Sequence, residues 1–136
     1  MSSVAVDTSV LLAIFKGEPR GEKWLDVLQS AAASGALVVS SVVYAEIRSF
    51  FPSGAACRSA LGDLDIVHSP LTEESADLAG RIFRVYREEG GPRTTILPDF
   101  LVAAHAATQA TALATEDRGY LRAYFPRIRI LTAKSA

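Results

Sequence analysis

The 136-residue chain has a single cysteine, Cys57, and only two histidines, His68 and His105. One cysteine cannot close an internal disulfide, and these three side chains are too few for a four-ligand structural zinc site. The longest apolar run, residues 10–15, ends at Lys16 and is far shorter than the roughly 20 residues of a membrane-spanning helix. No basic cluster precedes an apolar stretch at the amino terminus. We therefore expect a cytoplasmic protein with no secretory signal and no membrane partner.

Neither sign of charge is in excess, because 14 basic and 15 acidic residues give a net charge of −1. Lysine is scarce: eleven of the basic residues are arginine, whose guanidinium suits bidentate contact with phosphate. The balance does not decide for or against a nucleic-acid partner, since four metal-bound acids would leave the remainder at +3. A composition that is 49% hydrophobic and 21% charged excludes an intrinsically disordered chain.

Short apolar segments alternate with amphipathic segments along the chain. We expect strands at residues 3–6, 36–39, 65–68, 112–115 and 128–131. The segments between them predict helices at residues 10–15, 20–33, 42–51, 55–61, 73–89, 98–109 and 117–124. Continuously apolar strands that alternate with helices are typical of a parallel sheet covered on both faces. The sequence therefore predicts one α/β domain over residues 1–136, a three-layer sandwich with a sheet of about five strands.

Four acidic residues stand at the ends of these strands or near the starts of the following helices. Asp7 comes directly after the first strand, and Asp117 follows the fourth. Asp99 opens an alanine-rich helix, and Glu46 lies in the second turn of another. Functional groups of parallel sheets gather beyond the carboxyl ends of the strands. We therefore expect these four carboxylates to lie at one edge of the sheet.

Each aspartate also has a simpler interpretation as a helix cap, worth about 1 kcal/mol, and for any one of them alone this is the more common role. Glu46 comes too late in its helix to be a cap, and its apolar neighbours predict a buried carboxylate that needs a partner. Four clustered carboxylates repel one another unless they share protons or hold a cation. Oxygen ligands select Mg²⁺ or Mn²⁺, which suits hydrolysis of a phosphodiester.

Four segments, taken together, resemble PIN-domain ribonucleases, and specifically the VapC-type toxins of bacterial toxin–antitoxin pairs. They read VDTS at 6–9, SSVVYAE at 40–46, PDFLVAAHA at 98–106 and TEDRGY at 115–120. The resemblance implies a PIN-like fold and an endoribonuclease whose Mg²⁺ or Mn²⁺ is bound by Asp7, Glu46, Asp99 and Asp117. It also implies RNA as the substrate, a homodimer, and a small VapB-like antitoxin that occludes the site.

Within the acidic set, the resemblance implies that Asp7 and Asp99 bind the metal directly. Glu46 would bind the metal or deprotonate the attacking water, and Asp117 would act directly or through water. Hydroxyl groups that can fix these carboxylates come from Thr8, Ser9 and Thr115. The candidate phosphate-binding residues are Arg93, Arg118 and Arg122, which flank the third and fourth segments. Many relatives have a further acid where this chain has Gly119.

Two features outside these segments have alternative interpretations. Arg81, Arg84 and Arg87 recur every third residue, and they either contact RNA or, with Glu88 and Glu89 interleaved, form a solvated helix face. His105 lies on the alanine-rich helix, and we expect it to be packed or at the surface rather than a ligand, because hard ions prefer oxygen.

Other functions are compatible with an α/β fold of this size. A phosphate-receiver domain also uses aspartates at strand ends, but it needs a second acid beside Asp7 and a lysine near the last strand, where no lysine occurs between Lys23 and Lys134. A haloacid-type phosphatase needs an acid at the position of Ser9. A catalytically silent binding module would keep the fold without the chemistry, and the presence of all four acids argues against it.

Overall fold

The computed structural model describes residues 2–117 and 119–135. Five parallel strands form one sheet in the order β3-β2-β1-β4-β5. The strands are β1 (Ser3–Val6), β2 (Ala36–Ser40), β3 (Ile66–Ser69), β4 (Ala112–Ala114) and β5 (Ile130–Leu131). The first strand therefore lies at the centre of the sheet, paired on one side with a strand from the far end of the chain.

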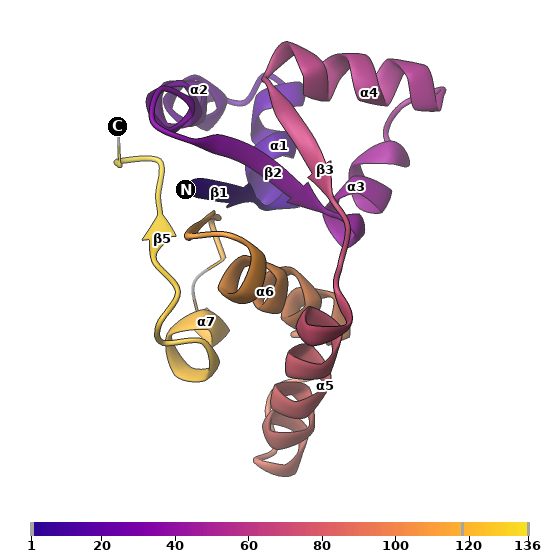
Figure 1. The fold of residues 1–136 in the computed structure, drawn as a ribbon, viewed down its shortest axis with the longest axis vertical. Coiled ribbons are helices and arrows are strands. Elements are labelled where there is room, and N and C mark those ends of the chain that lie inside the picture. The colour runs from indigo at the N-terminus through magenta and orange to yellow at the C-terminus, as the bar shows by residue number, and fades with distance from the viewer. Residues whose placement is uncertain (1, 118, 136) are drawn as a thin grey trace.

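Helices cover both faces of this sheet (Figure 1). One layer contains α1 (Thr8–Phe15), α2 (Pro19–Ala32) and α4 (Gly54–Asp63), and the other contains α5 (Glu73–Glu88), α6 (Leu97–Gln109) and α7 (Gly119–Tyr124). The short helix α3 (Ser41–Arg48) follows β2 directly and contacts both α1 and α6. The predicted three-layer α/β sandwich is confirmed.

The central strands are buried on both faces, which explains their continuously apolar sequence. All three residues of β4 are at most 2% exposed. The largest fully buried side chains are Trp24 of α2 and Phe100 of α6, one in each helix layer. Burial of a large apolar side chain contributes roughly 1.5–3 kcal/mol. No helix within residues 2–117 or 119–135 is long and apolar enough to cross a membrane.

The strand order reverses between β1 and β4, and this is where ligands bind in open parallel sheets. The backbone N–H of Asp7 donates to the carbonyl of Ala114 at 2.9 Å, so pairing continues to the residue after β1. Buried alanines of α6, including Ala103 and Ala104, let this helix pack closely on the two strands. Receiver domains have the order 2-1-3-4-5. The topology observed here therefore excludes the receiver interpretation.

Several boundaries differ from the sequence prediction for local reasons. α1 begins at Thr8, earlier than predicted, because Asp7 already takes the extended backbone of the cap position. α3 ends at Arg48, since the following N–H groups bond back to Ile47 and Arg48 in a turn. Asp65 has a φ of 57° and stands in the turn before β3 rather than in the strand. β5 is shorter than predicted because residues 126–128 form a turn.

Candidate active site at the carboxyl edge of the sheet

Two hydroxyl groups hold the carboxylate of Asp7 at the carboxyl end of β1. Ser9 Oγ donates to Asp7 Oδ2 at 2.8 Å, and Thr115 Oγ1 donates to the same oxygen at 2.9 Å. Neither hydroxyl therefore engages Oδ1. Asp7 occupies the cap position of α1 but makes no side-chain cap bond. Capping does not account for this carboxylate.

The same hydroxyl groups also connect the start of α1 to the loop after β4. Thr115 Oγ1, in a side chain that is 2% exposed, accepts the N–H of Asp117 at 3.0 Å. Ser9 Oγ accepts the N–H of Glu116 at 3.2 Å. The carboxylate of Glu116 instead pairs with Arg20 at 3.3 Å. These contacts fix the backbone at Asp117 next to Asp7 and assign Glu116 to a different partner.

Asp99 lies in the first turn of α6, and its carboxylate is half-buried. Its Oδ2 accepts the N–H of Ile96 at 2.9 Å, so the capping interpretation is correct for one of its oxygens. Burial raises the pKa of the Asp99 carboxyl, the Ile96 hydrogen bond lowers it, and the charges of Asp117 and Asp7 raise it. The three aspartates therefore form one electrostatic cluster.

Tyr120 is a site residue that sequence reasoning missed. Its hydroxyl donates to the backbone carbonyl of Asp99 at 2.9 Å and so ties α7 to the first turn of α6. Burial raises the pKa of Tyr120 well above its ordinary range, and the charges of Asp99, Asp7 and Asp117 raise it further. The phenol therefore stays protonated and keeps donating. The only sequence signal was its place in the TEDRGY segment.

Glu46 is exposed, so the prediction that it is buried is wrong. α3 turns Val43 and Ile47 into the core and leaves Glu46 on the outer side, where water solvates its charge. Thr8 Oγ1 donates to Glu46 Oε1 at 2.7 Å. Because Thr8 follows Asp7 in the chain, this bond connects the glutamate to the aspartate cluster.

The donors at this edge are carboxylate and hydroxyl oxygens, the chemistry that Mg²⁺ and Mn²⁺ prefer. Within the described residues, no three or more His, Cys, Asp or Glu side chains are arranged so that together they could hold a metal ion. The like charges of Asp7 and Asp117 act on the carboxylate of Asp99, and a fourth carboxylate is attached through Thr8. A divalent cation is the chemical group that such repulsion favours.

The candidate phosphate-binding arginines lie in different places. Arg122 and Asp117 line the same open hollow of 450 Å³. Arg93 lies in the loop before α6 and is exposed. Arg118 lies outside the described residues. His105 is fully buried and contacts Ser69 Oγ through Nε2 at 3.0 Å.

Comparison with protein families finds that the PIN domain matches residues 4–126. Comparison with curated protein sequences finds no match.

Solved structures share the fold at low sequence identity. VapBC2 from Rickettsia felis, bound to a DNA fragment of its promoter, has a chain with a TM-score of 0.73 and 19% identity, covering 96% of this chain and 98% of that one. DNA-bound VapBC from Salmonella typhimurium has a TM-score of 0.69 and 17% identity, and the match covers 98% of this chain and 99% of that one. Mycobacterium tuberculosis VapC20, described as a sarcin-ricin loop cleaving toxin, has a TM-score of 0.59 and 20% identity. The match covers 93% of this chain and 98% of that one.

Proposed function

Because the chain belongs to the PIN-domain family, we propose that it is a metal-dependent endoribonuclease and the toxin of a toxin–antitoxin pair. The observation that carries this proposal is the cluster of Asp7, Asp99 and Asp117 at the point where the strand order reverses. The VapBC structures that share the fold support an antitoxin partner, and VapC20 supports RNA as the substrate class.

The proposed cofactor is Mg²⁺ or Mn²⁺. Asp7 and Asp99 would hold it directly, and Asp117 and Glu46 would complete the oxygen set. When bound, such an ion supplies Lewis-acid polarisation of a phosphodiester and lowers the pKa of water. The hydroxyls of Ser9 and Thr115 suit this role for Asp7, because both hold the same carboxylate oxygen and leave the other to the site.

Other side chains near the cluster would transfer a proton, position Asp99 or bind the substrate. Glu46 is solvent-accessible and oriented by Thr8, so its carboxylate can take the proton of the attacking water. Tyr120 keeps the first turn of α6, and with it Asp99, in place. The proposed phosphate contacts are Arg93, Arg118 and Arg122, of which Arg122 shares a hollow with Asp117.

The assembly that we propose is a cytoplasmic homodimer of this single domain, residues 1–136, bound by a VapB-like antitoxin that covers the acidic cluster. A near-neutral chain suits such an assembly, because a positive RNA groove can be completed by a second copy.

Isothermal titration of Mn²⁺ into the wild-type chain and into Asp99→Asn tests the proposal, followed by cleavage of a mixture of transfer and ribosomal RNA. The wild type should bind Mn²⁺ and cleave RNA, whereas Asp99→Asn should lose both. Asp26→Asn, an exposed acid on α2, is the matched control and should behave as wild type. A folded wild type that neither binds Mn²⁺ nor cleaves RNA would overturn the proposal and favour a binding module.

A further inference from the structure

A second cavity, of 590 Å³, opens where the end of α5 meets the loop leading into α6. Its lining includes Phe83, Tyr86, Arg87, Arg93 and Ile96. Small-molecule sites occupy roughly 300–1,000 Å³. The cavity is therefore large enough for a nucleotide.

The walls of this cavity are fixed by contacts within the protein. The Tyr86 hydroxyl donates to the carbonyl of Pro92 at 2.5 Å. Gly91 lies against the Tyr86 ring so closely that a Cβ at this position would overlap ring atoms. Phe83 stacks near Tyr86, with ring centres 6.3 Å apart and planes at 15°. The loop is thus held on an aromatic surface, which preserves the cavity.

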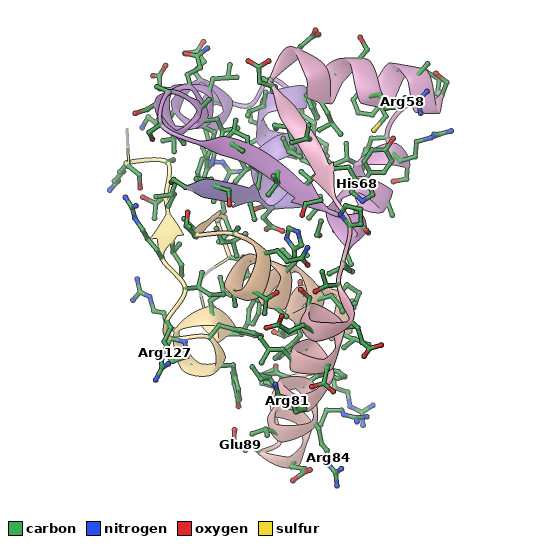
Figure 2. The ribbon with its side chains drawn as sticks, viewed as in Figure 1. Arg58, His68, Arg81, Arg84, Glu89 and Arg127 are labelled. Atoms are coloured by element: carbon green, nitrogen blue, oxygen red, sulfur yellow. The ribbon has the colours of Figure 1, made fainter. Side chains whose placement is uncertain are left out.

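Arg87 and Arg93 give the cavity a positive charge. The guanidinium of Arg87 lies over the Phe83 ring at 5.1 Å. Within the described residues, neither arginine forms an ion pair. The nearest acids in sequence have other partners: Glu88 pairs with Arg84 at 2.8 Å, and Glu89 accepts the Tyr124 hydroxyl at 2.8 Å. Figure 2 shows Arg84 and Glu89 near the outer end of α5.

The cavity adjoins the acidic cluster through the backbone. Ile96 lines the cavity, and its N–H donates to the carboxylate of Asp99 at 2.9 Å. Phe100, the residue after Asp99, packs against Phe83 and Tyr86 with ring centres 5.1 and 5.0 Å away. The lining residue Ile96 therefore connects the cavity to Asp99 through one hydrogen bond.

We propose that this cavity is a subsite for one nucleotide of single-stranded RNA beside the scissile phosphodiester. The base would lie against Phe83 and Ile96, and a phosphate would bind Arg87 and Arg93. Aromatic faces combined with arginines are the pattern by which proteins bind unpaired strands, and guanidinium groups are the natural partners of phosphate. The inference rests on the proposed ribonuclease function and adds Arg87 as a substrate-binding residue.

Binding of a fluorescein-labelled random 12-nucleotide RNA tests the subsite. The Asp7→Asn background prevents cleavage, and anisotropy is measured with and without Arg87→Gln or Arg93→Gln. Each variant should bind about tenfold more weakly, and the slope of log affinity against log salt should fall by about 0.7. Arg84→Gln removes the same charge one turn away on α5, outside the cavity, and should change affinity less than twofold. Equal thermal midpoints would show that folding is intact.

Photo-crosslinking gives a readout of position that does not depend on affinity. RNA containing 4-thiouridine should crosslink to peptides from residues 83–96 of the Asp7→Asn chain. If the wild type cleaves RNA but both arginine variants bind like Arg84→Gln, the subsite is wrong and the ribonuclease function stands. If the wild type neither binds nor cleaves RNA, both proposals fail. Loss of a dimer in Arg93→Gln with RNA binding unchanged would assign this face to a second copy and overturn the subsite.

Discussion

At the scale of single residues, the hydroxyl of Thr115 connects two of the three clustered aspartates. It donates to Asp7 Oδ2 and accepts the N–H of Asp117. Thr115→Val keeps the shape and removes both bonds, so Asp7 loses one of its two hydroxyl donors. We expect Mn²⁺ affinity and RNA cleavage to fall by roughly 10–100-fold, with a loss of about 1 kcal/mol in the free energy of unfolding.

Thr111→Val is the matched control for this prediction. Thr111 Oγ1 donates to the carbonyl of Ser3 at the opposite, amino end of the sheet. This variant should lose a similar amount of stability while cleavage stays near the wild-type rate. Equal losses of cleavage in both threonine variants would show that Thr115 acts only through folding.

The buried imidazole of His105 should make the free energy of unfolding depend on pH. Burial lowers the pKa of this imidazole, the contact with Ser69 raises it, and the charge of His68 lowers it. A pKa below the ordinary 6.5 means that the unfolded chain takes up the proton first. Stability is therefore fully present above pH 6.5 and is lost as the pH falls below it, at no more than about 1.4 kcal/mol per pH unit.

Urea unfolding at several pH values, with His105→Gln as the comparison, measures this effect. Glutamine keeps a hydrogen-bonding group opposite Ser69 but has no proton to gain. The variant should lose less stability than the wild type between pH 6.5 and pH 5. Parallel pH profiles would contradict an uncharged, buried His105.

The chain positions of the acids are visible in the sequence because an acid directly after an apolar strand stands out. The exposure of Glu46 is not visible in the sequence, because it depends on the rotation of α3 about its axis. Packing against α1 and α6 decides that rotation. Tyr120 was missed for a similar reason. Its hydroxyl meets the Asp99 carbonyl only after α7 and α6 have packed on the same face of the sheet.

At the scale of elements, the loop between α5 and α6 is held by the contact of Gly91 with the Tyr86 ring. Gly91→Ala forces the loop off this ring and disturbs Ile96, the hydrogen-bond donor to Asp99. We expect a loss of about 1–3 kcal/mol in the free energy of unfolding and a larger loss of cleavage than stability alone would cause.

Gly80→Ala, in the interior of the same α5 helix, provides the control. A Cβ at Gly80 meets no atom within 4 Å, so alanine should stabilise the helix by about 0.5–1 kcal/mol and leave cleavage unchanged. Thermal unfolding and initial cleavage rates of both variants give the comparison. Wild-type cleavage by Gly91→Ala would show that the loop does not position Asp99.

Helices and strands were predictable where apolar periodicity is strong, and less so where a turn decides the boundary. The end of α3 is an example: Phe50 and Phe51 extend the apolar pattern, yet their N–H groups close a turn instead of continuing the helix. Phe51 then packs edge-on against Phe15 of α1, a contact between segments that are distant in sequence.

At the scale of the molecule, the charge of the half-buried Asp99 opposes folding when no cation is bound. The pKa of Asp99 is raised, so the folded chain loses stability relative to the unfolded chain as the pH rises through that pKa. In EDTA at pH 7, Asp99→Asn should therefore melt at a higher temperature than the wild type. Asparagine can still accept the N–H of Ile96.

Mn²⁺ should reverse this order. An ion at 100 times its Kd stabilises the folded chain by about 2.7 kcal/mol, and only the wild type gains this. Differential scanning calorimetry of both chains in EDTA and in Mn²⁺ measures the reversal. The same order of melting temperatures in both solutions would contradict a metal site built on Asp99.

The architecture could be predicted because alternating apolar strands and helices allow few arrangements. The order of the strands could not be predicted, because the place of β4 beside β1 depends on the crossover through α5 and α6 to the other face of the sheet. The acidic cluster is a product of that crossover.

This pairing of β1 with β4 has a consequence for synthesis of the protein. Asp7 leaves the ribosome early, but Thr115, which fixes its carboxylate, is 108 residues later in the chain. A nascent chain that ends before β4 has neither this hydroxyl nor Asp117. Synthesis must therefore have passed β4 and Asp117 before the acidic cluster can assemble, so we expect shorter nascent chains to show no RNA cleavage.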